Sequence, residues 1–563
     1  MPLFGESNLR QGFSNVAAGW HSQFSGNIPN SVGFDRDDSQ HLERTTSSHS
    51  TNEVTLACWF QHIDEADGRT GGTNTGIISI GDGAALGSTN NGIWFSDGVL
   101  YFYANGQGST SNKVFGDQGW YHLIASYKLD EIGTEKGRFF INGIEYHDWN
   151  ADVRASGWGT SFNNVSKQFV GQIFQEYMDG YIAQPVFLDG QSIQGGDWTV
   201  DSFLDTYAVT PNRSVRTPKS NDDIKTLVDA APSDNSAFLP FTNASALGND
   251  GSTHGNNFGT LNNVSSADQS SHTPSQVYVH WNGRANTFTG DNVLGTAAAG
   301  RVDDHGTTLN ADSQGSSADV TGVGDLFIDT TDNSGKYYLE YQFGGSSFSG
   351  SYYVGFIGDR NADHLGDGGQ QTGYQGPEAT DRIRFQATQG TSAGQMQYYI
   401  DAASGVNLTL ASGGSFPRIV SASDRLGILY DFDNNQVVMY DKDGNASTPV
   451  SWTPDSPSIS LYAAGNGING TIFTDSADWT HSVANVKEWK SENISAPTYN
   501  GVDYFDAITY EGNGAGQRVG DFVPYTDLYT VDNSIIFDPG TKNHLQRTMS
   551  AAASDSNKKF TLS

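Results

Sequence analysis

Short apolar runs separated by glycine, asparagine, aspartate and serine recur along almost the whole chain. Apolar residues rarely recur at helical spacing for more than two turns, so amphipathic helices do not account for the pattern. Runs of about four to eight residues that are rich in aromatic and β-branched side chains are typical of strands. Glycine is abundant, with 67 residues, and 12% of the residues are aromatic. The pattern therefore predicts an all-β protein.

The first series of strand-like runs predicts one β-sandwich. Its strongest local signal is Asn142-Gly143, which separates two such runs. An Asn-Gly pair supplies the two positive-φ positions of a type I′ turn, so it predicts a hairpin. The expected strands of this sandwich are 54–60, 76–80, 92–95, 99–103, 120–127, 138–141, 144–147 and 181–188.

A second series predicts a second sandwich, and tandem antiparallel β-sandwiches are therefore the predicted fold class. The intervening segment 196–275 is poorer in strand-like runs and is expected to connect the two sandwiches, with a short helix at 222–231. The expected strands of the second sandwich are 336–343, 352–357, 382–386, 396–400, 426–432, 436–440 and 459–463.

The charge of the chain argues against two classes of partner. Lys and Arg number 30 and Asp and Glu number 63, which gives a formal net charge of 30 − 63 = −33. Nucleic acids and anionic membranes are bound through Lys and Arg that neutralise phosphate, so we expect neither as a partner. No apolar stretch reaches the roughly 18 residues of a membrane span, so membrane insertion is not expected.

Cysteine usage and the N-terminal sequence indicate the compartment of assembly. The lone Cys58 lies between Ala57 and Trp59 in a strand-like run, where we expect a small core residue that forms no intrachain disulfide. The start of the chain has no basic segment followed by an apolar run, so it does not match a secretory signal. We therefore expect assembly in a reducing cytosol. Release by cell lysis would then bring the protein outside, which points towards a virus of bacteria.

The two ends of the chain share an internal repeat. Residues 30–45 align without a gap with residues 533–548, and eight of these sixteen positions are identical. The first copy continues into the run 54–60, whereas the second stops at its first core strand. Residues 533–563 alone hold too few apolar groups for a core, so we expect the sequence to be the front part of a longer modular protein.

Two parts of the chain resemble known β-sandwich families. Residues 31 to about 190 resemble the concanavalin A-like, laminin-G-like jelly roll, through FDRDDSQHLERT, LACWF, WYHLIASY, FFINGIEY and MDGYIAQPVFLDG. GKYYLEYQF (335–343) and DRLGILYDFDNNQVVMYDKDG (424–444) resemble a SPRY-like sandwich. With the segments 238–258 and 504–519, these modules follow an order similar to that in structural proteins of bacteriophages.

The resemblance implies a domain organisation for the whole chain. The expected parts are a virion-attachment segment (1–28), a concanavalin A-like sandwich (29–195), a connecting region (196–275), a SPRY-like sandwich (276–492), linker strands (493–532) and an incomplete second laminin-G-like repeat (533–563).

The same resemblance implies a non-enzymatic virion protein, a tail fibre or spike made in the bacterial cytoplasm and exposed on the particle. It implies contacts with other virion proteins through residues 1–28, a homotrimer, and binding to neutral or cation-bridged glycan on the host surface. A capsid head fibre or decoration protein and a glycan-degrading tailspike remain alternatives. A bacterial surface adhesin would need the signal peptide that the sequence lacks.

The acidic loops predict turns more readily than metal sites. A calcium loop needs glycine at its sixth position and an acidic ligand at its twelfth. Counted from Asp431, these positions hold Gln436 and Lys442, so Asp431, Asp433 and Asn435 are expected to form a turn. Asp441 and Asp443 before Gly444 are interpreted in the same way.

Structural calcium has one better candidate. Laminin-G-like sandwiches sometimes hold calcium at a rim of loop carboxylates, and Asp64, Glu65 and Asp67 are the best such cluster. A solvated acidic loop is the favoured interpretation, so no motif supports a metal or other cofactor.

No set of residues predicts catalysis. The loop Gly81, Gly83, Leu86, Gly87 lacks the third glycine and the following helix of a dinucleotide site. Asp130, Glu131 and Glu135 do not alternate along a strand as the carboxylates of concanavalin-like glucanases do, and are expected in a surface loop.

Tryptophans offer the only ligand-binding candidates. Trp94, Trp149 and Trp158 could form a sugar-stacking platform on a sandwich rim, although packing in the core is equally compatible with each. No ligand-binding residue is therefore assigned from the sequence.

Overall fold

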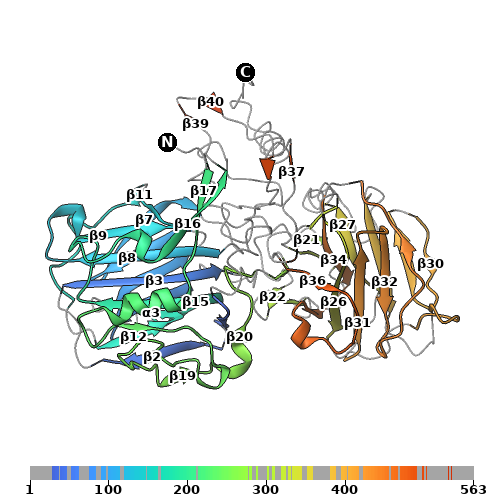
Figure 1. Ribbon diagram of the computed structural model, residues 1–563, viewed down its shortest axis with the longest axis horizontal. Coiled ribbons are helices and arrows are strands. Elements are labelled where there is room, and N and C mark those ends of the chain that lie inside the picture. Colours follow the sequence, from blue (N-terminus) through green and yellow to red (C-terminus); the bar gives the residue numbers. More distant parts are fainter. Residues whose placement is uncertain are drawn as a thin grey trace. The chain divides into compact units, whose positions relative to one another are not determined.

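The computed structural model of the protein divides into two compact units, the first ending at Val277 and the second beginning at Tyr278 (Figure 1). In the described residues, no helix is both long and apolar enough to cross a membrane. The structure describes residues 28–36, 38–46, 52–62, 75–83, 90–96, 99–114, 120–147, 149–162, 166–210, 213–276, 278–281, 287–289, 301–303, 307–310, 319–324, 328–330, 333–344, 351–358, 381–388, 395–401, 403–417, 423–455, 458–466, 469–490, 493, 498–499, 502–503, 530–531 and 534–535.

Several predictions concern residues outside these ranges. They include the attachment segment except Ile28, the acidic cluster Asp64, Glu65 and Asp67, the segment 504–519, and residues 536–563 of the second repeat.

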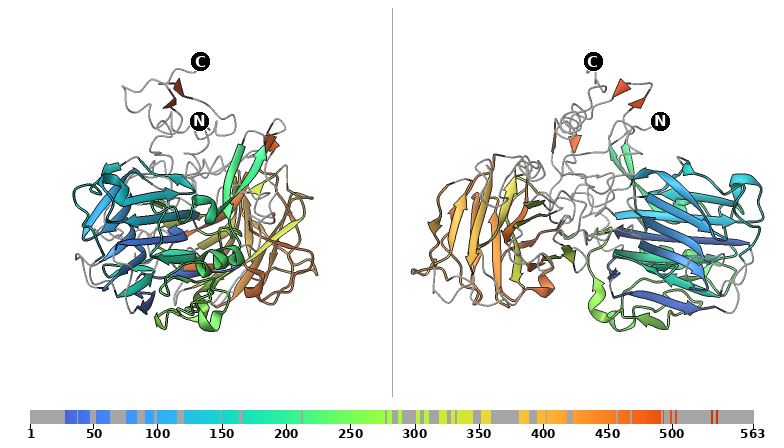
Figure 2. Two further views of the ribbon diagram at one scale, coloured as in Figure 1. Left: turned by 60° about the vertical axis from the view of Figure 1, so that its left-hand side comes forward. Right: turned by 180° about the vertical axis from the view of Figure 1, so that it is seen from behind.

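The first unit is a sandwich of two eight-stranded antiparallel sheets, here called sheets 1A and 1B (Figures 1 and 2). Sheet 1A has the order β10 (Ile144–Glu145), β9 (Gly137–Ile141), β8 (Trp120–Lys128), β3 (Glu53–His62), β15 (Gly180–Asp189), β1 (Ser31–Phe34) and β20 (Gln269–Ser270), with β18 (Ala237–Phe238) beside β15. Sheet 1B has the order β11 (Trp149–Ala151), β7 (Gln107–Val114), β6 (Val99–Ala104), β5 (Asn91–Ser96), β4 (Thr75–Gly81), β12 (Lys167–Val170), β2 (His41–Thr45) and β19 (Thr260–Asn262).

Alternating residues of the two sheets meet in the core of the first unit. Cys58 is fully buried there, as expected, and burial raises the pKa of its thiol. The predicted Asn142-Gly143 hairpin is also confirmed, because both residues have positive φ (49° and 79°) and Ile141 pairs with Ile144. The core includes Val32, Leu42, Leu56, Phe60, Ile78, Ile93, Phe95, Leu100, Phe102, Leu123, Ile141, Val170 and Ile182.

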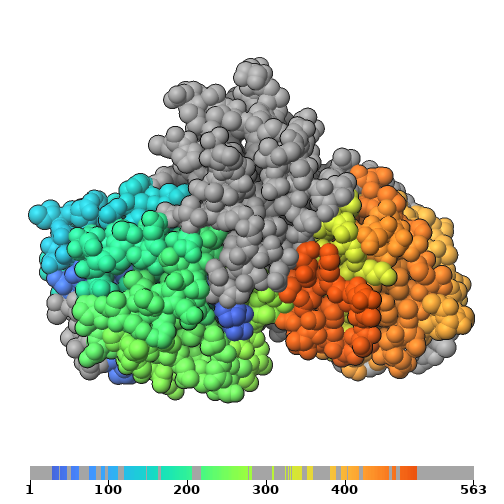
Figure 3. All heavy atoms as spheres, in the orientation of Figure 1, coloured from blue at the N-terminus to red at the C-terminus, as the bar shows by residue number. Residues whose placement is uncertain are grey.

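The segment 196–275 does more than connect two sandwiches. Its short strands β18, β20 and β19 pair with β15, β1 and β2 of the first unit. The predicted helix is confirmed as α3 (Asn221–Asp229), where the side chain of Ser220 accepts the N-cap hydrogen bond from Asp223 N (3.2 Å). Much of the visible face of the first unit in Figure 3, in green, belongs to this part of the chain.

This segment covers the outer face of sheet 1A. The rings of Trp198 and Phe203 lie close to those of Phe140 and His122, on the side of the sheet opposite the core. Strands β3 and β8 are therefore buried on both faces. The smaller elements of the first unit are β13 (Gln172–Ile173), β14 (Glu176–Tyr177), β16 (Leu204–Thr210), β17 (Arg213–Pro218), η2 (Gly133–Lys136), η3 (Val200–Ser202), η4 (Ala244–Ala246) and η5 (Ser266–Asp268).

The second unit is again a sandwich of two eight-stranded sheets, 2A and 2B, antiparallel except where β26 and β36 pair in parallel. Sheet 2A has the order β21 (Thr287–Thr289), β24 (Asp319–Val323), β34 (Ser458–Asn466), β27 (Ser351–Gly358), β28 (Arg382–Thr388), β29 (Gln397–Ile400) and β30 (Val406–Asn407), with β25 (Ile328–Asp329) beside β34. Sheet 2B has the order β22 (Arg301–Asp303), β23 (Thr308–Asn310), β35 (Asn469–Phe473), β26 (Lys336–Phe343), β31 (Arg425–Asp431), β32 (Gln436–Tyr440) and β33 (Val450–Ser451), with β36 (Lys487–Glu488) beside β26.

Aromatic rings join the two sheets of the second unit. Phe356 of sheet 2A stacks on Trp489 at 5.1 Å between ring centroids and lies 5.5 Å from Tyr430 of sheet 2B. Both units thus confirm the predicted fold class of tandem antiparallel β-sandwiches. The remaining short elements are η8 (Ser476–Asp478), β37 (Thr498–Tyr499), β38 (Val502–Asp503), β39 (Thr530–Val531) and β40 (Ser534–Ile535).

Candidate functional site

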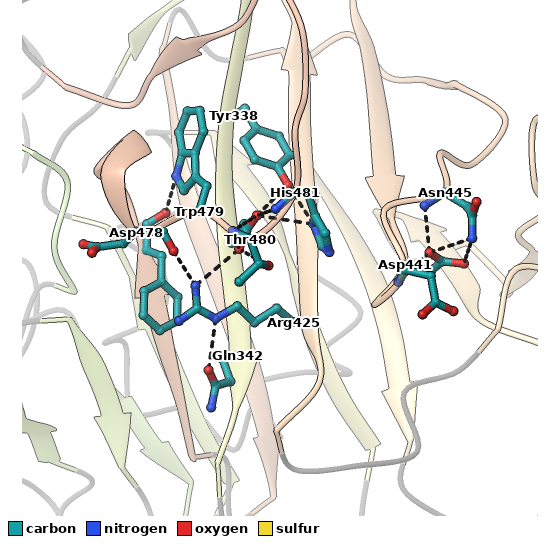
Figure 4. A network of polar contacts seen from close by, with 12 residues as sticks. Tyr338, Gln342, Arg425, Asp441, Asn445, Asp478, Trp479, Thr480 and His481 are labelled. Atoms are coloured by element: carbon teal, nitrogen blue, oxygen red, sulfur yellow. Dashed lines mark hydrogen bonds and ion pairs between the residues drawn. The ribbon is translucent and has the colours of Figure 1, made fainter.

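The acidic loops of the second sandwich are built as turns. Asp431 Oδ1 accepts hydrogen bonds from Asp433 N (3.1 Å) and Asn434 N (3.2 Å). Asp441 does the same for Asp443 N (3.0 Å) and Asn445 N (2.8 Å), and Figure 4 shows Asn445 beside it. The predicted turn chemistry is confirmed. Within the described part of the chain, no group of three or more His, Cys, Asp or Glu side chains is placed to hold a metal ion.

The carboxylates considered for catalysis lie where a surface loop was expected. Asp130 and Glu135 are exposed, and Glu131 forms a 3.8 Å ion pair with Lys128. The loop after β4 includes Gly83, at positive φ (77°), and the next described strand is β5. Among the described residues, Asp130, Glu131 and Glu135 form no group that could hold a metal ion, and Leu86 and Gly87 lie outside the described residues.

The three candidate tryptophans do not form one platform. Trp158 is buried in the core, where its Nε1 donates to the carbonyl of Gln107 (3.0 Å). Trp149 packs against the same core, with its ring 5.7 Å from that of Phe102. Trp94 is partly exposed and alternates along β5 with the buried Ile93 and Phe95, so it lies on the opposite, outer face of sheet 1B.

On this outer face, Trp94 belongs to a group of four rings, here called the aromatic cluster: Trp94, Tyr101, Tyr103 and Phe174. Tyr101 lies directly opposite Trp94 in the strand pairing, with the ring centroids 5.0 Å apart. The ring of Phe174 lies 5.8 Å from Trp94 and 4.7 Å from Tyr103, edge-on in both cases. Trp94, Tyr101 and Tyr103 keep part of their surface exposed.

A strained hairpin positions Phe174. Phe174 and Gln175 form the turn between β13 and β14, with backbone φ angles of 56° and 66°. Residues other than glycine and asparagine rarely adopt such angles. The hairpin lies directly on β4, because a Cβ at Gly76 would come within 2.3 Å of Ile173 N and Glu176 O. Strained non-glycine turns persist where the surrounding structure holds them, and they are common at functional sites.

The polar atoms of the aromatic cluster are the indole N–H of Trp94 and the hydroxyls of Tyr101 and Tyr103. Trp94 Nε1 is fully buried and, among the described residues, has no hydrogen-bond acceptor. Burial raises the pKa of Tyr103, and the neighbouring Tyr101 raises it further, so its hydroxyl stays protonated. The cluster therefore offers neutral aromatic surface and a hydroxyl donor, without a charged or nucleophilic group.

A second candidate is the polar network on the outer face of sheet 2B (Figure 4). At its centre Glu340 is completely buried and accepts hydrogen bonds from Thr480 N (2.9 Å), Thr480 Oγ1 (2.8 Å) and His481 N (2.7 Å). Tyr338 Oη lies 3.0 Å from His481 Nδ1, and Arg425 Nη1 lies 3.5 Å from Glu340 Oε2.

The Glu340 network anchors a segment of chain and does not suit acid–base catalysis. Burial alone would raise the pKa of Glu340, but the hydrogen bonds from Thr480 and His481 outweigh it and hold the pKa below its usual range. A general acid or base needs access to substrate and a pKa near the working pH. Glu340 has neither, and its acceptor positions serve to hold Thr480 and His481 on the sheet.

Comparison with known proteins gives similarity at the level of fold. No protein-family model matches the chain, and no curated protein matches it significantly. Among solved structures, the SPRY domain of human HERC1 is similar at 13% identity and a TM-score of 0.20, over 30% of this chain and 89% of that chain. A SAP-like pentraxin from Limulus polyphemus is similar at 13% identity and 0.22, over 29% and 76%. The TRIM65 PSpry domain is similar at 9% identity and 0.18, over 31% and 84%.

These likenesses concern β-sandwich domains, and TM-scores of this size carry no argument about function. The candidate site therefore rests on the geometry of the chain itself.

Proposed function

We propose that the protein is a non-enzymatic glycan-binding display protein of a bacteriophage particle, a tail fibre or spike. The virion assignment rests on the resemblance in module order. The binding assignment rests on one observation, the aromatic cluster on the outer face of sheet 1B. Trp94, Tyr101 and Tyr103 are partly exposed there, the buried Phe174 packs against Trp94, and none of the four rings carries a charge.

Neutral sugars suit this surface. The apolar faces of pyranose rings pack on aromatic side chains, and the hydroxyls of Tyr101 and Tyr103 can exchange hydrogen bonds with sugar hydroxyls. The net charge of −33 disfavours a strongly anionic polysaccharide at a neutral site unless cations bridge the two.

Binding by one site is expected to be weak, in the millimolar to micromolar range or about −4 to −8 kcal/mol. A homotrimer, which we include in the proposal, would present three copies together and gain avidity without a stronger single site.

The test compares purified 1–563 with its Trp94→Leu variant on an array of neutral bacterial surface glycans. We expect the variant to bind roughly five- to tenfold more weakly, because leucine keeps apolar packing but loses the aromatic face. Ile144→Ser, at a partly exposed apolar position on β10 of the same unit, is the matched control and should bind normally. Equal binding by Trp94→Leu contradicts the proposal, and release of new reducing ends from the glycan would favour a tailspike enzyme.

A further inference from the structure

The second sandwich buries a guanidinium group that has no carboxylate partner among the described residues. Arg384 lies in the middle of β28, between Ile383 and Phe385, which are completely buried. Because side chains alternate along a strand, Arg384 lies on the outer face of sheet 2A. Only 5% of its surface is exposed.

Two tyrosine rings enclose the guanidinium. Its central carbon lies 4.6 Å from the ring centroid of Tyr353 and 5.0 Å from that of Tyr399, which are cation–π distances. Tyr399 is held in place by the chain, because a Cβ at Gly405 would come within 2.7 Å of its hydroxyl oxygen. The position of the charge is thus fixed before any ligand arrives.

No acceptor in the described part of the chain satisfies this charge. Arg384 Nε and Nη1 are fully buried without a hydrogen-bond partner. Its pKa is lowered by burial and by the neighbouring positive charge of Arg382. A guanidinium nevertheless stays protonated, so the face holds a desolvated positive charge that none of the described carboxylates pairs with.

Two described carboxylates at the end of β28 accept backbone hydrogen bonds. Asp401 Oδ1 accepts a hydrogen bond from the backbone of Arg382 (3.0 Å), and Asp381 Oδ1 accepts one from Asp455 N (2.6 Å). Arg382 itself donates through Nη1 to the hydroxyl of Tyr462 (3.0 Å). The two rings stabilise the buried charge in part, but an opposite charge would stabilise it further, and none of the described residues supplies one.

Amide and hydroxyl groups lead from Arg384 towards solvent. Tyr399 Oη donates to Gln386 Oε1 (2.7 Å), and Gln397 Nε2 donates to Asn407 Oδ1 (3.0 Å). The strand pairing places Gln386 opposite Gln397 and Gln397 opposite Asn407, which is exposed. Groups that both donate and accept hydrogen bonds suit sugar hydroxyls.

We propose that the outer face of sheet 2A binds an acidic saccharide, whose carboxylate pairs with Arg384 and whose hydroxyls contact Gln386, Gln397 and Asn407. A carboxylate forms charge-assisted hydrogen bonds with a guanidinium, and the flanking tyrosine rings supply faces for the sugar ring. The inference rests on the proposed function only in expecting a sugar as ligand. It adds a second site, on the other sandwich and with the opposite charge preference to the aromatic cluster.

The test uses the full chain and a trigalacturonate probe in calorimetric titrations, with the methyl-esterified trisaccharide as the uncharged counterpart. We expect the acid to bind at least tenfold more tightly than the ester, and to lose this preference in Arg384→Met. Lys442→Gln, which removes an exposed positive charge from the same sandwich, should keep it. Equal binding of acid and ester, or an unchanged preference in Arg384→Met, overturns the inference.

Thermal unfolding keeps a folding defect apart from a binding defect. Arg384→Met replaces an uncompensated charge by an apolar side chain of similar length, so its melting temperature should equal or exceed that of the parent chain. A large fall in melting temperature would show that the chain itself pairs the guanidinium, which also overturns the inference. Binding of neutral glycan through Trp94 is measured in a separate experiment. The proposal for the aromatic cluster and the proposal for Arg384 can therefore be contradicted independently.

Discussion

In each sandwich, a segment of the chain covers the outer face of one sheet. The polar group buried beneath this segment differs between the two sandwiches. Under the segment that covers sheet 1A lies His122, whose ring contacts those of Trp59 and Phe203. Complete burial lowers its pKa to about 3, so it is neutral at physiological pH. In the second sandwich, the chain at Thr480 and His481 covers part of sheet 2B, and the ionised Glu340 lies beneath it. In the first sandwich, a neutral histidine packs among aromatic rings beneath the covering segment. In the second, the covering segment is held by hydrogen bonds that its N–H groups donate to a carboxylate.

This difference predicts unequal responses to mutation and to acid. A neutral buried group makes ordinary hydrogen bonds, each of modest net value, whereas a buried charge loses much more when its partners are removed. The following changes test the contrast.

Glu340→Gln should have the largest effect. The amide keeps the shape but removes the negative charge, and an NH2 group replaces the oxygen that accepts from Thr480 Oγ1 and faces Arg425. We therefore expect a loss of about 3 kcal/mol in the free energy of unfolding of the second sandwich. Calorimetry and hydrogen exchange of β26 would measure it. Asp443→Asn, an exposed carboxyl-to-amide change in the same unit, should change stability by less than about 0.5 kcal/mol. Similar losses in the two variants would contradict the contrast.

At pH values above the titration of Glu340, acid should destabilise the first sandwich more than the second. An unfolded histidine titrates near pH 6.5, whereas His122 in the folded state has a pKa of about 3. Below about pH 6.5 the unfolded chain binds a proton that the folded chain does not, so the first sandwich loses about 1.4 kcal/mol per pH unit from this group. The contribution of Glu340 is present above its unfolded pKa of about 4.5 and is lost as the pH falls through its lower folded pKa.

His122→Leu should therefore flatten the pH dependence of the first sandwich between about pH 6.5 and 4.5. Urea unfolding at several pH values, followed by hydrogen exchange of β3 and β8, measures the slope in each variant. An undiminished slope in His122→Leu would assign the acid sensitivity to another group.

Thr55→Val should have the smallest effect. Thr55 Oγ1 accepts from Trp198 Nε1 (3.2 Å), which ties the cover to sheet 1A, and donates to the carbonyl of Gln191 in the loop after β15 (2.8 Å). Because the groups are neutral, we expect a loss of about 1–2 kcal/mol, measured by urea unfolding. Thr134→Val, at an exposed position in η2, is the matched control. A loss as large as that of Glu340→Gln would remove the distinction between neutral and charged covers.

Local sequence signals predicted much of the fold. Asn142-Gly143 marks its hairpin because few other residues adopt positive φ at both turn positions. Long strands such as β3 and β8 are mostly apolar along their whole length because both of their faces are buried. The strands β18, β19 and β20 have two or three residues each, and pairing with distant strands defines them, so no local pattern marks them.

The candidate sites were less predictable for a related reason. The sequence predicts Trp94 and Trp158 as candidates for sugar stacking, but it does not tell them apart. The structure shows that Trp94 lies on the outer face of sheet 1B, whereas Trp158 lies in the core. Phe174 and Gln175 gave no turn signal, because neither residue type favours positive φ. Glu340 and Arg384 are polar residues in strands, and their burial depends on which distant segment covers each outer face.

The pairing of β1 with β20 has a mechanical consequence for the first unit. Ser31 pairs with Ser270 and Val32 with Gln269, so the chain enters and leaves at the same end of this strand pair. Tension applied through the two ends would open the pair one hydrogen bond at a time, like a zipper, and would then meet the pairing of β1 with β15. When the unit is pulled by its ends, we therefore expect the pairing of β1 with β20 to break first, while the aromatic cluster on the other sheet keeps its structure.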